Sequence, residues 1–236
     1  MPMVNIPTAH GTMDAYLATP DDAGPWPGVL VVHDALGLTT DLRRQADWLA
    51  EAGFLALAPN LYHWGSRMRC LITAMRGVAS GRGRTYDDID AARRWLASHD
   101  GHTGRTGVIG FCLGGCYALA VATGAYDASS VNYGFIDDPR QALEGACPIV
   151  GSYGAKDRSL TDVPQQLDQV LTELSVAHDI KVYDDAGHGF LNDHPPNEKP
   201  LWACFVGSFV NDGYHEPSAT DARRRIIDFF DTHLKR

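Results

Sequence analysis

The sequence lacks any apolar run of the roughly 18 residues that a membrane-spanning helix needs. Residues 1–20 contain neither a basic segment nor a long apolar core, so we expect no secretory signal and a cytoplasmic protein. A basic stretch is missing too, and the formal net charge is −9 at pH 7. Phosphate backbones and anionic membranes attract clustered Lys and Arg, so we expect neither a nucleic acid nor a membrane as a partner.

The cysteines do not form a recognisable metal site. The chain has 5 cysteines, and although Cys112 and Cys116 lie close together, no second cluster completes a zinc ligand set. Because no export signal is evident, we expect reduced thiols rather than disulfides. Four cysteines are interpreted as small buried apolar residues: Cys70, Cys116, Cys147 and Cys204.

Candidate strands and helices alternate along the chain, with no linker, repeat or low-complexity segment. Short continuous apolar runs are typical of strands buried on both faces, and a 3.6-residue apolar period is typical of helices. The expected strands are residues 12–18 at a sheet edge, 27–34, 54–59, 105–111, 147–154 and 179–185. The expected helices are 39–52, a short one near 67–79 within the loop 60–84, 86–99, 113–125, 161–175 and 218–235, the last capped by Ser218. This order predicts one α/β domain over residues 1–236, with a mostly parallel sheet covered by helices on both faces.

One glycine-rich segment, GFCLGG at residues 110–115, follows an expected strand and opens an expected helix. It has the pattern of a nucleophile elbow, with Cys112 where serine is commoner. A sharp strand-to-helix turn strains the backbone of the nucleophile, and Gly110 and Gly114 remove side chains that would clash there. The turn also places the thiol at a helix N-terminus, where the helix dipole favours the thiolate. Taken alone, the segment fits a glycine-rich turn around a buried cysteine equally well.

Two segments further along the chain strengthen this interpretation. Asp157 comes just after the expected strand 147–154, and His188 lies between two glycines after the strand 179–185. Each residue alone is compatible with an ordinary surface turn. However, the order nucleophile, acid, histidine is that of the α/β-hydrolases, and all three residues follow strands at their carboxyl ends, where open parallel sheets collect catalytic groups. We therefore predict Cys112 as nucleophile, His188 as base and Asp157 as the residue that orients the base.

These motifs resemble the dienelactone hydrolase family. The likeness rests on GFCLGG, on Asp157 after the next core strand and on AGHGF at residues 186–190, and it extends from VLVVHDALGL at 29–38 to the closing helix. The cysteine nucleophile is specific, because most α/β-hydrolases carry serine there. The resemblance implies an α/β-hydrolase fold, hydrolysis of a small lactone or carboxylic ester with carboxymethylenebutenolidase as the type activity, and no metal or organic cofactor.

The resemblance also implies roles for the loop after the strand 27–34. A family glutamate contacts the resting thiol there, and Asp34, which is one methylene shorter, stands at that position. The backbone N–H groups of Ala35 and Leu113 would form the oxyanion hole. Two preorganised donors of this kind stabilise the tetrahedral oxyanion of acyl transfer.

The substrate-binding positions depart from the family pattern. The type enzyme has an arginine four residues after the catalytic histidine, which grips a substrate carboxylate, and that position is Asn192 here. A bidentate carboxylate clamp is therefore incomplete, and we expect a substrate that lacks this carboxylate or carries it elsewhere. Tyr62 is a candidate for a pocket wall. A second family arginine lies in the loop before the central helix, for which the candidates are Arg67, Arg69, Arg76, Arg82 and Arg84.

The expected reaction proceeds through an acyl-enzyme. A thiolate attacks the lactone or ester carbonyl, and water activated by His188 then releases the acid. Three alternatives stay open: a carboxylesterase or thioesterase-like hydrolase of unrelated substrates, a hydrolase fold that binds a ligand with little turnover, and thiol redox sensing through Cys112 and Cys116. We expect a monomer or small homo-oligomer.

Overall fold

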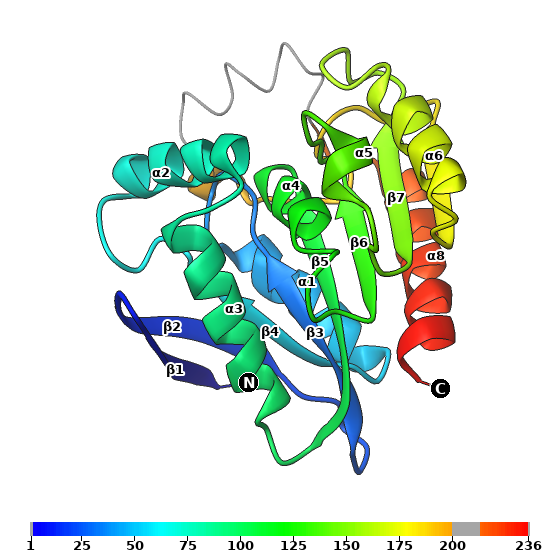
Figure 1. Ribbon diagram of the computed structural model, residues 1–236. Helices are drawn as coiled ribbons and strands as arrows, with labels where there is room; N and C mark the ends of the chain where they lie inside the picture. Colours follow the sequence, from blue (N-terminus) through cyan, green and yellow to red (C-terminus); the bar gives the residue numbers. More distant parts are fainter. Residues whose placement is uncertain (1, 200–212, 236) are drawn as a thin grey trace.

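The computed structural model describes residues 2–199 and 213–235, and within them eight strands form one sheet (Figure 1). The order across the sheet is β1-β2-β4-β3-β5-β6-β7-β8. The strands are β1 Met3–Thr8, β2 Gly11–Ala18, β3 Trp26–Val32, β4 Leu55–Pro59, β5 His102–Phe111, β6 Ala128–Asn132, β7 Ile149–Gly154 and β8 His178–Tyr183. From β4 to β8 neighbouring strands are parallel, whereas β1 pairs with β2 and β2 with β4 in antiparallel fashion. The predicted mostly parallel sheet is confirmed.

Helices cover both faces of this sheet, as predicted. In Figure 1, α3 and α4 lie in front of the sheet, and α1 and α8 lie behind it. This alternation follows from the chain order, because a crossover between parallel strands has to pass over one face or the other. The helices are α1 Thr40–Glu51, α2 Arg67–Ser80, α3 Arg84–Ala97, α4 Leu113–Ala120, α5 Pro139–Ala142, α6 Val163–Glu173, the 3₁₀ turn η1 Pro196–Glu198 and α8 Glu216–Leu234.

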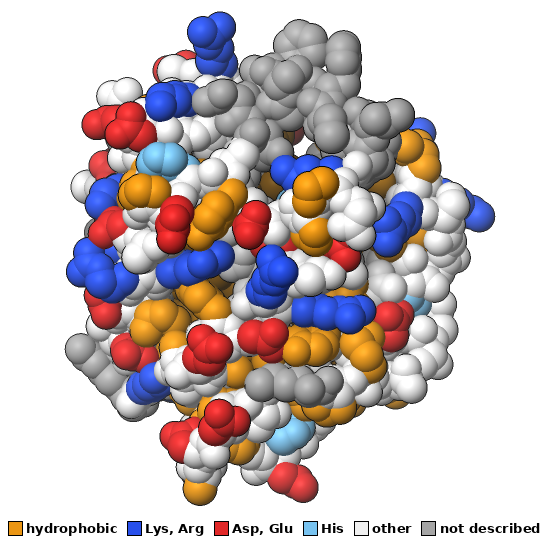
Figure 2. Space-filling view, turned by 180° about the vertical axis from the view of Figure 1, so that it is seen from behind, with side chains coloured by type: hydrophobic (Ala, Val, Ile, Leu, Met, Phe, Trp, Pro, Cys, Tyr) orange, Lys and Arg blue, Asp and Glu red, His pale blue; other side chains and the backbone are white. Residues whose placement is uncertain are grey.

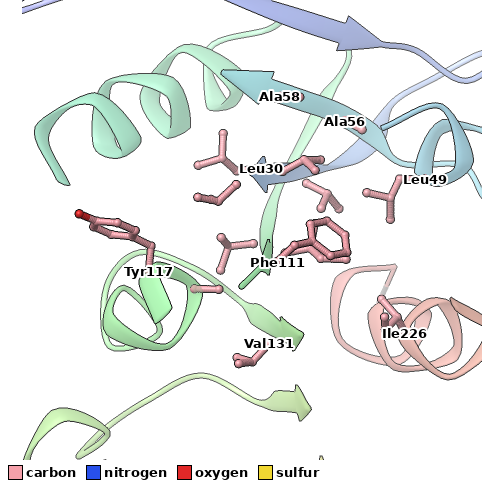
Figure 3. Packing of buried hydrophobic residues seen from close by; sticks show 14 of the residues in the cluster. Leu30, Leu49, Ala56, Ala58, Phe111, Tyr117, Val131 and Ile226 are labelled. Carbon is pink, nitrogen blue, oxygen red and sulfur yellow. The ribbon is translucent and has the colours of Figure 1, made fainter. Parts of the chain in front are cut away.

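The hydrophobic core lies on both sides of the central strands. Leu30 of β3 and Phe111 of β5 are fully buried between Tyr117 of α4 and Ile226 of α8 (Figure 3). Such strands have no solvated face, which is why they read as continuous apolar runs. The apolar pattern therefore located the strands that carry the site. The solvent-facing side of the helix layer is polar instead. Figure 2 shows acidic and basic side chains interspersed over the side of the molecule that α1 and α8 form.

The sheet edge is not where the sequence pattern indicated. The expected edge strand, β2, lies between β1 and β4, so the prediction of an edge position is wrong. The edge strand on this side of the sheet is β1, which has a single buried side chain, Ile6, and the opposite edge strand is β8. A short, half-exposed strand of this kind produces little apolar signal.

Strand β6 escaped prediction for the opposite reason, since it is entirely buried but largely polar. Its sequence is ASSVN, and its polar side chains bond to backbone carbonyls. Ser129 Oγ donates to the Ala118 carbonyl at 3.0 Å, and Asn132 Nδ2 donates to the Gly110 carbonyl at 3.1 Å. These bonds offset the cost of burying polar groups, but they form only after distant segments meet.

Two helix ends also differ from expectation. Helix α8 begins at Glu216 and is preceded by His215, so Ser218 lies inside the helix and is not its N-cap. The reason is Pro217, whose fixed φ suits the first helical turn. Ser218 Oγ instead bonds to His215 Nδ1 at 2.8 Å. Helix α4 ends at Ala120, several residues before the expected boundary.

The described cysteines are free thiols. Cys70 and Cys116 are buried as predicted, but Cys147 is only half-buried, so the prediction of a buried side chain is wrong there. Cys147 lies just before β7, where the chain enters the sheet from the surface. Cys204 lies outside the described residues.

Candidate active site

Three chemically active side chains follow parallel strands at the same edge of the sheet. Cys112 follows β5, Asp157 follows β7 and His188 follows β8. Because the carboxyl ends of parallel strands meet at one edge, residues far apart in the sequence come together there. The order and placement are those that the sequence predicts.

Cys112 occupies a strained turn between β5 and α4. Its backbone has φ 53° and ψ −114°, a conformation that side-chain-bearing residues rarely adopt. A Cβ on Gly110 would collide with the Gly114 carbonyl, and a Cβ on Gly114 would collide with the Val32 carbonyl. The Cys112 N–H donates to the Asn132 carbonyl at 3.0 Å, which ties the turn to β6. Strain of this kind persists because the surrounding structure imposes it, and it is common at functional sites.

His188 is held between a buried carboxylate and the thiol. Its Nδ1 lies 2.6 Å from Asp157 Oδ2, and since a carboxylate only accepts, Nδ1 carries the proton that is donated. The Asp157 side chain is 1% exposed. The Cys112 side chain lies within electrostatic range of the imidazole, and its charge contributes to raising the pKa of His188. The carboxylate, the imidazole and the sulfur are thus neighbours at one edge of the sheet.

The electrostatics of these three groups favour a charged imidazole. Burial works to lower the pKa of His188, but the charge of Cys112 and the hydrogen bond to Asp157 outweigh it and raise the pKa to about 10. For Asp157 burial works to raise the pKa, and hydrogen bonds from His188 and Ser159 outweigh it, so this pKa is lowered. Both directions favour an imidazolium paired with the Asp157 carboxylate. A charged imidazole near the sulfur is how cysteine sites present a thiolate near neutral pH.

Ser159 holds the second oxygen of the buried carboxylate, a role that was not predicted. Its N–H and its hydroxyl both donate to Asp157 Oδ1, at 3.0 and 2.6 Å. This is a local turn in which an Asp side chain accepts from the residue two positions on. A serine two positions after the predicted catalytic aspartate was the available sequence signal.

We expect Ser159→Ala to lower kcat by about 10-fold while KM changes little. The alanine keeps the backbone N–H but removes one of the two donors to Asp157 Oδ1. The imidazole is then oriented less strictly, an effect expected in the chemical step. Steady-state kinetics with an aryl ester would measure it. An unchanged kcat would show that the hydroxyl does not support the catalytic carboxylate, and Ser159→Thr, which keeps a hydroxyl, is the matched control.

A second buried hydrogen-bond network, which begins at Tyr133, packs against the imidazole ring of His188. The Tyr133 ring centroid lies 5.1 Å from that of His188, and the Tyr133 hydroxyl donates to Asn192 Oδ1. Asn192 Nδ2 donates in turn to Asp41 Oδ2 at 2.6 Å. Asn192 is 4% exposed and both ends of its amide bind protein groups, so the structure does not support its predicted contact with substrate. The sequence offered no signal for Tyr133 or Asp41, which come from unrelated segments.

The loop after β3 carries the predicted oxyanion donor. Asp34 Oδ1 accepts from the Leu36 N–H at 2.7 Å, which folds the chain around Ala35 into a tight turn. Asp34 Oδ2 lies 2.6 Å from His194 Nε2. Each carboxylate oxygen of Asp34 thus has a partner, and neither partner is the Cys112 thiol that the family pattern implies. Leu113, the other predicted donor, is the first residue of α4, where N–H groups have no partner within the helix.

Tyr62 lies beside both the nucleophile and this loop. It is 7% exposed, and its hydroxyl donates to the Ala35 carbonyl at 3.4 Å. Burial raises the pKa of Tyr62, and the charges of Asp34 and Cys112 raise it further. Tyr62 therefore lies within electrostatic range of Asp34 and Cys112. This position is compatible with the predicted place of Tyr62 in a pocket wall.

The candidate arginines lie at or near the surface: Arg67, Arg69, Arg76 and Arg82 are exposed and Arg84 is half-buried. Arg67 and Arg69 are exposed in the first turn of α2. The guanidinium of Arg69 is 5.7 Å from the Trp64 ring centroid, and that of Arg84 is 4.4 Å from it. The interactions that the structure gives these two arginines are with an aromatic face rather than with the catalytic groups.

In the part of the chain that the structure describes, no helix combines the length and apolar character that crossing a membrane requires. Among the same residues no group of three or more His, Cys, Asp or Glu is arranged to hold a metal ion.

Comparison with known proteins gives a consistent result. The family model described as "Dienelactone hydrolase family" matches residues 13–234. A Yersinia pestis protein named "Putative carboxymethylenebutenolidase" is 28% identical over 248 residues, covering 97% of this chain and 86% of that protein. A Rhodococcus opacus carboxymethylenebutenolidase is 27% identical, covering 93% and 86%. The crystal structure of "Putative Dienelactone Hydrolase" from Klebsiella pneumoniae has a TM-score of 0.77 and 28% identity, covering 97% of each chain.

Proposed function

The chain belongs to the dienelactone hydrolase family of α/β-hydrolases, and we propose that it cleaves a small lactone or carboxylic ester through an acyl-enzyme on Cys112. Its relatives are hydrolases, and the coarse activity follows from them. The observation that carries the finer proposal is the strained, glycine-flanked turn that presents Cys112 beside His188, whose imidazole is oriented by the buried Asp157 carboxylate.

The first half of the reaction forms a thioester. The Cys112 thiolate attacks the carbonyl carbon, and the N–H groups of Ala35 and Leu113 stabilise the oxyanion that forms. When the tetrahedral intermediate collapses, the carbon–oxygen bond to the leaving group breaks and the His188 imidazolium gives its proton to the departing alkoxide. The raised pKa of His188, about 10, keeps this proton in place at neutral pH.

The second half returns the enzyme to its starting state. The now neutral His188 takes a proton from water, and the hydroxide attacks the thioester carbon. Collapse breaks the carbon–sulfur bond, the thiolate leaves and the carboxylic acid is released. Asp157 keeps the imidazole in the tautomer and orientation that both halves need.

The alternatives are supported less well. Redox sensing needs a second reactive thiol, but Cys116 is buried, burial raises its pKa to about 12 and its sulfur accepts the Phe135 N–H. A ligand-binding protein has no need of an oriented imidazole. A carboxylesterase or thioesterase of other substrates shares the same chemistry and is separated by comparing aryl esters with dienelactones as substrates. Cytoplasmic location and a monomeric or small homo-oligomeric state remain predictions from the sequence.

A slowly hydrolysed aryl ester tests the proposal. Mass spectrometry of the quenched enzyme should show one acyl group on Cys112, whereas Cys112→Ala should show none and should have no measurable turnover. In the same variant the pKa of His188 should fall well below about 10, because the charge of Cys112 that raises it is gone, and NMR titration of the imidazole would report this. Full esterase activity in Cys112→Ala would refute the assignment.

A further inference from the structure

A second histidine–aspartate pair joins the two loops that carry His188 and Ala35. His194 Nε2 is 2.6 Å from Asp34 Oδ2, and their side chains are 6% and 13% exposed. His194 belongs to the same loop as His188, whereas Asp34 belongs to the loop that carries Ala35. The pair therefore joins the segment that supplies the base to the segment predicted to supply an oxyanion donor. Neither His194 nor Asp34 takes part in the proposed steps on Cys112.

The position of Asp34 creates an electrostatic problem for the reaction. Asp34 is adjacent to Ala35 in the chain, and Tyr62 is within electrostatic reach of both Asp34 and Cys112. A carboxylate this near the reacting centre repels the negative charge that develops on the substrate oxygen. In a site shielded from water such a repulsion would cancel part of the stabilisation that the backbone N–H groups give.

We propose, on the basis of the proposed function, that His194 is a positioning residue which acts through Asp34, neutralising its charge and holding its turn so that the Ala35 N–H can stabilise the oxyanion. The geometry supports both parts. One oxygen of Asp34 accepts from the Leu36 N–H and shapes the turn, while the other is taken by His194. The His194 imidazole thus pairs with the Asp34 carboxylate and acts on the reaction only through it.

The surroundings of His194 favour its charged form. Burial works to lower its pKa, but the hydrogen bond and charge of Asp34 outweigh it, and the pKa is raised. The nearby charges are the acidic Asp41 and Glu198, which add to this effect, and Lys199, which opposes it. Glu198 also binds the N–H and hydroxyl of Thr40 at 2.9 and 2.6 Å, which fastens the segment after His194 to the start of α1.

A double-mutant cycle tests the inference. His194→Gln keeps a hydrogen-bond donor but no charge, so kcat/KM for an aryl ester should fall roughly 10- to 100-fold, a loss of the order caused by removing one oxyanion-hole donor or somewhat less. Asp34→Asn removes the charge that needs neutralising and keeps an acceptor for Leu36. The double variant Asp34→Asn, His194→Gln should therefore recover most of the lost activity.

Recovery is the decisive readout, because a purely structural role for His194 predicts that the two changes add or worsen one another. Activity in the double variant no higher than in His194→Gln would overturn the inference, and so would unchanged activity in His194→Gln. His10→Ala removes a half-buried histidine that pairs with Asp87 at 3.2 Å and is the matched control, with no expected loss.

The inference and the proposed function fail in different ways. Acylation of Cys112 in the wild-type enzyme, measured by mass spectrometry before the cycle, decides the proposed function. If Cys112 is acylated and the cycle shows no recovery, only the role of His194 is wrong. If Cys112 is never acylated while ester is turned over, the acyl-enzyme of the proposed function is wrong, and the double-mutant cycle still reports separately on His194 and Asp34.

Discussion

His188→Ala should lower kcat by about 10⁴-fold or more, with a much smaller change in KM. In the proposed mechanism the imidazole gives a proton to the leaving alkoxide and activates water for the second half-reaction, so its removal affects both halves of the reaction. Losses of this size are typical when the base of a catalytic triad is removed, because the triad acts as a unit. Steady-state kinetics with an aryl ester would measure the change.

The fold should survive this substitution, which makes the kinetic result interpretable. His188 lies on a loop after β8 and contributes little to the apolar core. Circular dichroism and thermal unfolding of His188→Ala should therefore resemble those of the wild type. His178→Ala, which changes a half-buried histidine at the start of β8, is a control that should keep its activity. A loss of less than 10-fold in His188→Ala would remove the imidazole from the mechanism.

Gly114→Ala should destabilise the protein by more than about 3 kcal/mol, a large effect for the addition of one methyl group. A Cβ at this position would overlap the carbonyl oxygens of Val32 and His33, which are backbone atoms and cannot rotate away. The start of α4 would have to move away from the end of β3. Denaturant unfolding would measure the loss of stability, and activity should fall as well because Cys112 and the loop after β3 are displaced together.

The appropriate comparison is a glycine with room for a side chain. A Cβ on Gly65 would meet Cys70 and Arg69 side-chain atoms at 3.5 and 3.7 Å, which is ordinary contact. Gly65→Ala should therefore change the free energy of unfolding by about 0.5 kcal/mol or less. Equal destabilisation by the two substitutions would show that the close approach of α4 to β3 is not what requires Gly114.

The three residues of the proposed triad could be placed at one sheet edge from the sequence because local sequence and global topology agree at each of them. A nucleophile elbow needs glycines on both sides of Cys112 wherever it occurs, so its signature is local. Asp157 and His188 follow strands that are recognisable from their position in an alternating pattern, and parallel topology then brings their strand ends to one edge. No knowledge of side-chain contacts was needed to select these three residues.

The supporting groups could not be predicted in this way. Tyr133, Asn192 and Asp41 come from three separate segments, and they meet only because the loop after β8 packs against α1. Asn192 shows the difficulty, since its place in the family pattern suggested substrate binding, whereas packing turned its amide inward. Which hydrogen bond a polar side chain makes depends on which groups lie within about 3 Å of it, and a linear pattern does not contain that distance.

By itself, the sequence determined most of the alternating order of strands and helices, the parallel core of the sheet and the three residues of the proposed triad, because periodicity, turn chemistry and strand order act through neighbouring residues. Only the tertiary structure decided that β1 rather than β2 is the edge strand, that β6 is a buried polar strand, and that Asp34 pairs with His194 instead of the thiol. These features depend on contacts between segments far apart in the chain, where burial and hydrogen-bond geometry select among partners that the sequence leaves equivalent.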